Sequence, residues 1–253
     1  SLSDEIVDEI IIKIKGQALY KNRLMMLDII AENNWERPIY FTGGSFGDDD
    51  YLWMKDYLQL EGLCYKLVPI KTPMDQSNPY EMGRVNTEKM YTMVKDWDWG
   101  TKGSSNVYFD VESRKNSITY RSNISRLVDQ LILENKNDKA EEITDIVIEN
   151  MPVNIFGYYT LLESYIDSYY KLEKKEKARN LFSEIAKKYK ENLFYFSNLK
   201  DENKNRYAEE IYTDIERYRS LVGVIISYEE GEFLEKQMED FNSYLELFIG
   251  KEE

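Results

Sequence analysis

The residues best placed for chemistry are three consecutive aspartates, Asp48, Asp49 and Asp50. Asp48 and Asp50 form an Asp-x-Asp pattern, which in nucleotide-sugar enzymes holds a divalent cation against a diphosphate, because hard cations prefer oxygen ligands. Helix capping is the competing interpretation, since acidic side chains also stabilise the first turn of a helix. We favour capping of a helix over residues 51–58. The alternative is a metal at Asp48 and Asp50, in an autonomous metal-dependent enzyme acting on sugar phosphates.

Two further carboxylates, Asp56 and Glu61, lie close together just before an apolar run. A pair of carboxylates at a suitable separation can hydrolyse a glycosidic bond. Nothing in the sequence fixes the separation of these two, so we expect structural roles such as hydrogen bonds to loop backbone.

Histidine is absent from all 253 residues. Its absence excludes Ser-His and Cys-His nucleophile pairs, imidazole zinc sites and histidine general bases. The single cysteine, Cys64, lies inside an apolar run and has no intramolecular disulfide partner, so we interpret it as a small core residue. The leading interpretation therefore assigns no catalytic residue and no cofactor.

The chain is strongly acidic, with 33 basic against 47 acidic residues and a net charge of −14. Such a chain repels phosphate backbones and anionic lipid, so we expect it to bind neither nucleic acid nor lipid directly. No stretch approaches the ~20 consecutive apolar residues of a membrane span.

Tyrosine is abundant, with 21 residues. Tyr158, Tyr165 and Tyr169 belong to a segment that is richer in aromatic residues than core packing requires. Tyrosine suits groove linings, because its ring packs while its hydroxyl meets water. We therefore predict a peptide-binding groove at these three residues, with ordinary packing between helices as the alternative.

The N-terminal part shows short apolar runs separated by turn signals. Alternating isoleucines predict a strand over 9–15, although a helix competes there because isoleucine also recurs every four residues. Helical periodicity predicts helices over 19–33 and 51–58, and short runs predict strands over 38–42 and 63–68. This order is typical of a small, mostly parallel α/β layer.

From about residue 117 only helices are expected, arranged as hairpins with an internal repeat. Residues 138–143 (Asp-Lys-Ala-Glu-Glu-Ile) are matched in type by 176–181 (Glu-Lys-Ala-Arg-Asn-Leu), a spacing of 38. This resembles the tetratricopeptide repeat, in which a small residue, here Ala140 and Ala178, lets two helices approach closely. The other packing positions would be Leu127, Tyr165, Leu131, Tyr169, Val147 and Ile185.

The sequence thus predicts an α+β protein in two parts. Residues 1–103 would form the small α/β domain, and residues 104–253 would form an all-α, tetratricopeptide-like array of helical hairpins. The boundary is placed in residues 100–105, which are polar, glycine-rich and without apolar periodicity.

Two motifs carry a family resemblance. Residues 33–41 read Asn-Asn-Trp-Glu-Arg-Pro-Ile-Tyr-Phe, and residues 56–63 read Asp-Tyr-Leu-Gln-Leu-Glu-Gly-Leu, followed by Leu-Val-Pro-Ile at 67–70. Together they resemble the soluble C-terminal region of a family of bacterial multi-pass membrane proteins. That region is a domain of unknown function, related to the protein O-mannosyltransferases.

Members of that family look like polyprenyl-phosphate-sugar-dependent transferases whose acidic catalytic residues lie in an early loop. The resemblance implies that this chain is the extracytoplasmic tail, on the periplasmic face of the inner membrane, and that no catalytic residue can be carried over to it. We expect the tail to hold or present an exported polypeptide acceptor, or to pack on the membrane domain of its parent transferase. A purely structural interaction module is a further possibility.

Overall fold

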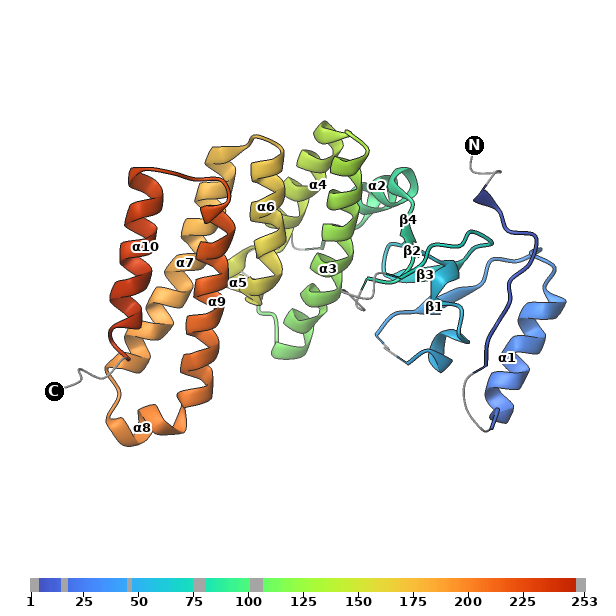
Figure 1. The fold of residues 1–253 in the computed structure, drawn as a ribbon, viewed down its shortest axis with the longest axis horizontal. Helices are drawn as coiled ribbons and strands as arrows, with labels where there is room; N and C mark the ends of the chain where they lie inside the picture. The colour runs from blue at the N-terminus through green and yellow to red at the C-terminus, as the bar shows by residue number, and fades with distance from the viewer. Residues whose placement is uncertain (1–4, 15–17, 45–46, 75–80, 101–106, 249–253) are drawn as a thin grey trace. The chain divides into compact units, whose positions relative to one another are not determined.

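The computed structural model describes residues 5–14, 18–44, 47–74, 81–100 and 107–248. The chain divides into two compact units, Ser1–Asp98 and Trp99–Glu253 (Figure 1). The fold is broadly α+β, as the sequence predicts, with a small sheet in the first unit and helices in the second. The predicted boundary at 103–104 falls outside the described residues and stays a prediction.

The described part of the first unit contains two helices, four short strands and two 3₁₀ turns. In chain order they are α1 (Lys21–Glu32), β1 (Tyr40–Thr42), η2 (Asp49–Tyr51), η3 (Lys55–Tyr57), β2 (Leu58–Glu61), β3 (Cys64–Leu67), β4 (Arg84–Val85) and α2 (Thr87–Asp96). Helix α1 and strands β1 and β3 lie within the ranges that the sequence predicts, 19–33, 38–42 and 63–68.

The sheet is mixed, with the strand order β1-β3-β2-β4. Strand β3 pairs antiparallel with β1 and with β2, and β2 pairs parallel with β4. The prediction of a mostly parallel layer is therefore wrong. Only Gly62 and Leu63 separate β2 from β3, and Gly62 has φ +65°, so the chain turns back as a hairpin; a parallel pair needs a crossover of about a dozen residues.

Two element predictions in this unit also fail. Residues 9–14 form no strand, and the segment reaches the rest of the unit through an isolated bridge between Ile6 and Ile70. The helix predicted over 51–58 is replaced by 3₁₀ turns and the start of β2. Leu52 and Trp53 both adopt left-handed backbone angles, φ 51° and 59°, which no α-helix of L-residues accommodates.

The core of the first unit lies on one face of the sheet. Phe41, Leu60 and Tyr65 are opposite one another on neighbouring strands and are all buried. Tyr51 packs on this row, with its ring centroid 5.9 Å from that of Phe41 and 6.3 Å from that of Tyr65.

The described part of the second unit is helical. Its elements are α3 (Val111–Leu133), α4 (Asn137–Asn150), α5 (Val153–Phe156), η4 (Tyr159–Leu162), α6 (Glu163–Lys171), α7 (Lys175–Ser197), α8 (Asp201–Arg206), α9 (Ala208–Ile226) and α10 (Glu232–Leu245). Helix α3 packs on α4, α6 on α7, and α9 on α10, while α6 also contacts α3 and α7 contacts α9 (Figure 1). Within the described ranges, no helix is both long and apolar enough to cross a membrane.

One turn occurs twice in this unit, 38 residues apart. Asn135 and Glu173 have φ of 58° and 61°, and each ends a helix. The next residue then donates back to the preceding helix, from Lys136 N–H to Leu131 O at 2.9 Å and from Lys174 N–H to Tyr169 O at 2.8 Å. Ala140 and Ala178 are fully buried after these turns, and so are the six other predicted packing positions, at 3% exposure or less.

Candidate functional site

The N-terminal segment of the first unit has no core of its own. Among described residues before Phe41, which are 5–14 and 18–40, none is buried. Helix α1 likewise contains no buried residue. A segment this apolar, whose described residues are at most half-buried, gains less hydrophobic stabilisation from its own unit than full burial would give.

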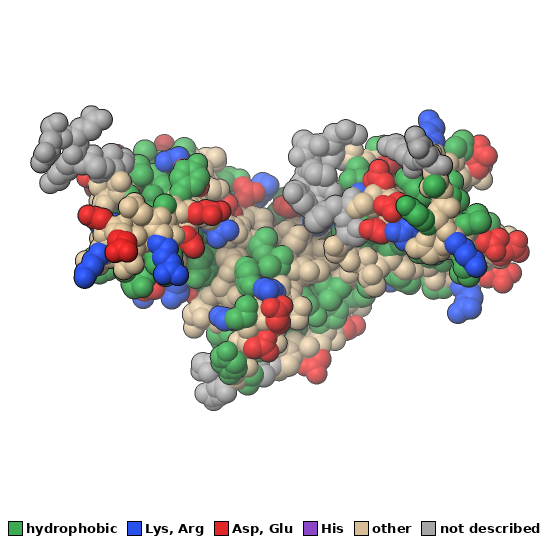
Figure 2. Space-filling view, turned by 90° about the horizontal axis from the view of Figure 1, so that it is seen from below, with side chains coloured by type: hydrophobic (Ala, Val, Ile, Leu, Met, Phe, Trp, Pro, Cys, Tyr) green, Lys and Arg blue, Asp and Glu red, His purple; other side chains and the backbone are tan. Residues whose placement is uncertain are grey.

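Large apolar side chains are exposed along this segment. They include Ile29 at 64% and Trp35 at 54%, and the full set is Ile6, Ile11, Ile14, Tyr20, Leu24, Met25, Ile29, Trp35 and Tyr40. We call these nine residues the N-terminal apolar surface. In the view of Figure 2, hydrophobic side chains are exposed between charged ones of both signs. A high density of exposed apolar groups in one segment makes it a candidate interaction site.

A cleft of about 520 Å³ opens beneath this segment. Its walls come from the N-terminal residues, from α1 and from the sheet, and include Ile10, Ile30, Ile39 and Leu67. Its size lies in the range of about 300–1,000 Å³ that is typical of ligand and side-chain pockets. The lining is mostly apolar, so the cleft fits an apolar group.

A strained turn presents Trp35 at the edge of the cleft. Asn34 and Trp35 have φ of 46° and 59°, and left-handed angles cost non-glycine residues roughly 1 kcal/mol or more each. Asn33 holds the turn, because its side-chain N–H donates to Arg37 O at 2.8 Å and its carbonyl accepts from Glu36 N–H at 2.9 Å. Strain of this kind, held by its surroundings, is typical of functional sites.

The predicted metal residues are engaged in ion pairs. Asp48 contacts Lys55, with an Nζ–Oδ1 distance of 3.1 Å, and Asp50 pairs with Arg23, which also reaches Asp49 at 3.3 Å. Within the described ranges, no group of three or more acidic, cysteine or histidine side chains could hold a metal ion. Asp48 precedes the 3₁₀ turn Asp49–Tyr51 without a side-chain capping hydrogen bond, so the predicted helix capping is wrong. Lys55 and Arg23 offset part of the charge of the three aspartates.

Asp56 and Glu61 have the structural roles expected of them. Asp56 accepts Met74 N–H at 3.3 Å, which fixes a loop. Glu61 is buried and accepts from Tyr40 Oη at 2.7 Å, from Gln59 Nε2 at 2.8 Å and from Lys89. These donors lower the pKa of Glu61 against the raising effect of its burial, the largest single influence, so the carboxylate stays ionised.

The three predicted groove tyrosines are not side by side on a surface. Tyr165 is fully buried and Tyr169 is 3% exposed, which removes both from any groove open to solvent. Tyr165 Oη donates to the Arg121 carbonyl at 2.6 Å, and Tyr169 Oη donates to Asp145 at 2.7 Å. Burial raises the pKa of both hydroxyls. Their prediction as binding residues is wrong because both lie where helices pack; only Tyr158, half-buried, can face a ligand.

Arg121 joins two of these tyrosines, and sequence reasoning missed it. Its guanidinium donates to the carbonyls of Gly157 and Tyr158, and to Met151 O at 2.6 Å. It is fully buried, and burial lowers its pKa to about 10. Arg121 thereby fixes the loop in which Tyr158 adopts φ 51°. The sequence offered one signal for Arg121, which is that an arginine occupies a core position of a predicted helix.

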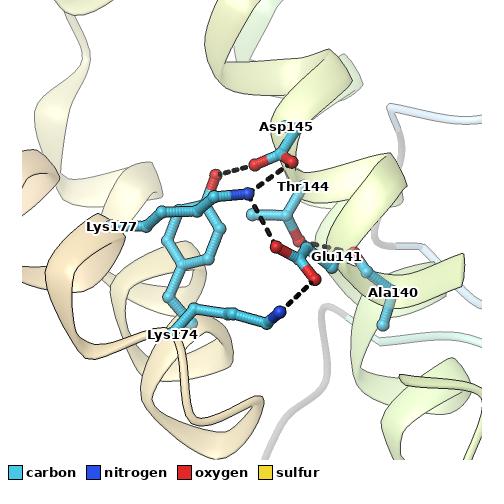
Figure 3. A network of polar contacts seen from close by, with 7 residues as sticks. Ala140, Glu141, Thr144, Asp145, Lys174 and Lys177 are labelled. Atoms are coloured by element: carbon cyan, nitrogen blue, oxygen red, sulfur yellow. Dashed lines mark hydrogen bonds and ion pairs between the residues drawn. The ribbon is translucent and has the colours of Figure 1, made fainter. Parts of the chain in front are cut away.

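A polar network ties the second of the two turns and the start of α7 to helix α4 (Figure 3). Lys177 contacts Glu141 at 2.7 Å and Asp145 at 2.6 Å, and Lys174 contacts Glu141 at 2.7 Å. The two lysines lower the pKa of Glu141. Tyr169 donates to the same Asp145, so this tyrosine fixes the spacing of α4 and α6–α7.

Residues 1–89 match the family model of the TMEM260-associated domain 2. The matched residues are similar to that domain, and they include the apolar surface, the cleft and the sheet. No curated protein and no solved structure matches the chain.

Proposed function

We propose that this chain is a non-catalytic, extracytoplasmic domain of a membrane glycosyltransferase similar to the protein O-mannosyltransferases, and that it packs on the transferase core. The main observation behind this proposal concerns the N-terminal segment. No described residue before Phe41 is buried, although the segment contains many large apolar side chains. An apolar segment that the domain does not bury itself is suited to burial against another protein surface.

The match to the TMEM260-associated domain supports this assignment. It covers residues 1–89, which are also the residues that carry the apolar surface. A partner in the membrane-embedded part of the same protein explains why the surface is apolar rather than charged. The periplasmic side follows from the family resemblance and forms part of the proposal.

We further propose that the helices of the second unit form a tetratricopeptide-like array. The repeated turn at Asn135 and Glu173, with the same hydrogen bonds 38 residues apart, supports it. The buried alanines that follow each turn support it as well. In this arrangement the array is a spacer or interaction scaffold, and it needs no catalytic group.

Photo-cross-linking in cells tests the packing proposal. A photoreactive amino acid at Leu24 or Ile29 should form a cross-link to the membrane-embedded part of the same polypeptide or to a membrane-embedded protein. Leu133 and Tyr212, exposed at 75% and 65% in the second unit, are matched control positions and should give none. Absence of any cross-link from Leu24 and Ile29, or equal yields at the control positions, would exclude packing through this surface.

A further inference from the structure

Strand β1 leaves one edge of the sheet open. It is the first strand in the order β1-β3-β2-β4, so it has a neighbour on one side only. Ile39 O accepts from Leu67 N–H at 2.9 Å, which makes Ile39 and Leu67 a hydrogen-bonded pair. Because such pairs alternate in antiparallel strands, Phe41 bonds to Tyr65, while the backbone groups of Tyr40 and Thr42 point away from β3.

Across the described ranges, no backbone or side-chain group bonds to these outward-facing groups. The N-terminal segment, which the sequence predicts as a strand, pairs elsewhere through the bridge between Ile6 and Ile70. Tyr40 and Thr42 are themselves exposed. The edge therefore offers two N–H donors and two carbonyl acceptors at strand spacing, a pattern that matches the backbone of an extended chain.

The apolar cleft adjoins the start of this edge. Ile39, the residue before β1, lines the cleft together with Trp35 and Leu27. Peptides that add to a sheet edge gain affinity from main-chain hydrogen bonds and specificity from pockets for alternate side chains. A strand beside β1 would have the cleft within reach of an apolar side chain.

We propose that β1 binds an extended polypeptide segment as a further strand of the sheet, with an apolar side chain of that segment in the cleft. The inference goes beyond the proposed packing on the transferase core, because it identifies how such a domain would also hold a polypeptide acceptor. The bound segment is neutral or basic, since the cleft wall carries Asp8 and Glu9 and the whole chain carries −14. Only Tyr40 and Thr42 supply outward groups, so binding is weak and reversible.

A synthetic peptide of alternating valine and threonine, carrying a dye, is the probe. Fluorescence anisotropy should show binding to the intact chain, and the tryptophan emission should shift to the blue as Trp35 becomes covered. The same peptide methylated at every amide nitrogen cannot donate ladder hydrogen bonds from either edge and should bind about tenfold more weakly or worse.

Thr42→Pro removes an outward-facing N–H, a change that edge strands tolerate, whereas Thr42→Val keeps it. Thr42→Val should bind like the unsubstituted chain, and Thr42→Pro should lose about tenfold or more in affinity. If Thr42→Pro does not fold, the comparison of the methylated and unmethylated peptides on the unsubstituted chain still tests the proposal. No binding of the unmethylated peptide, or equal binding of the methylated one, overturns the proposal.

Light scattering, which measures molecular mass in solution, tests whether the added strand comes from a second copy of the chain. A dimer that Thr42→Pro dissociates would show that the added strand comes from a second copy, which also overturns the peptide proposal. Cross-linking at Leu24 and Ile29 reads out packing on the transferase independently, because neither residue lies in β1. Failure of the peptide experiment would therefore leave the packing proposal standing, and the reverse also holds.

Discussion

Arg121 shows how one buried cation can order a loop without an acidic partner. Its hydrogen bonds go to backbone carbonyls of Met151, Gly157 and Tyr158, and its Nε has no partner among the described residues. A buried charge in such a place is costly, and the carbonyls it serves would be unsatisfied without it.

Arg121→Met should lower the free energy of unfolding by about 3 kcal/mol, because it leaves buried carbonyl groups without donors. Urea denaturation followed by circular dichroism measures the change. Arg219→Met is the control, since Arg219 forms a surface pair with Glu216 and should change stability by less than about 0.5 kcal/mol. Equal losses in the two variants would contradict a structural role for Arg121.

Glu229 makes the stability of the second unit depend on acid pH. It is buried and accepts both guanidinium N–H groups of Arg179, at 2.7 and 2.6 Å, which lowers its pKa from 4.5 to about 2. A carboxylate with a lowered pKa adds stability above its unfolded pKa and loses it as the pH falls through the folded one.

The free energy of unfolding should therefore fall as the pH drops from about 4.5 towards 2, the unfolded and folded pKa values of Glu229. Glu229→Gln should be less stable near neutral pH and show a shallower decline in this window, because it cannot titrate. Glu232→Gln, at an exposed position of α10, should keep the full decline. Identical pH profiles for Glu229→Gln and the unsubstituted chain would refute the assignment.

At the scale of the single element, strand β4 depends on the glycine that precedes it. Gly83 precedes β4 with φ +67°, and a Cβ there would lie 2.1 Å from the Leu58 carbonyl oxygen on β2. Glycine is therefore required both by the left-handed angle and by the close approach of the two strands.

Gly83→Ala should destabilise the first unit by more than about 2 kcal/mol, because neither the backbone angle nor the contact can be relieved cheaply. Gly223, in α9, has nothing within 4 Å of an added Cβ, so Gly223→Ala should stabilise by about 0.5–1 kcal/mol. Thermal melts of both variants provide the comparison. A neutral Gly83→Ala would mean that β4 does not approach β2 in solution.

At the scale of the whole molecule, the N-terminal apolar surface should contribute to association rather than to stability. Leu24 and Ile29 are 56% and 64% exposed, so Leu24→Ser with Ile29→Ser should change the free energy of unfolding by less than about 1 kcal/mol. The same pair should reduce binding of a hydrophobic dye such as ANS. A large loss of stability would show that these side chains belong to a core.

The candidate functional site was less predictable from the sequence than the helices and strands were. The motif around Trp35 stood out in the sequence, but its left-handed angles could not be predicted, since they arise from the hydrogen bonds of Asn33. Tyr165 and Tyr169 were correctly predicted to pack between helices, and their burial removes them from a groove open to solvent. A tyrosine serves either purpose, and only the neighbouring helix decides which.

What the sequence determined by itself is local. Helical periodicity located α1 and the helical nature of the second unit, and the 38-residue spacing located two turns with the same backbone. The lack of histidine excluded imidazole chemistry. The tertiary structure alone decided the direction of the strands, the burial of the tyrosines and the exposure of the N-terminal isoleucines. The periodicity of apolar residues indicates which side of a helix or strand is apolar, because residues only a few positions apart in the sequence make up that side. Which surface then covers that side depends on contacts between distant residues, and for residues 5–14 and 18–40 the described chain does not supply full burial.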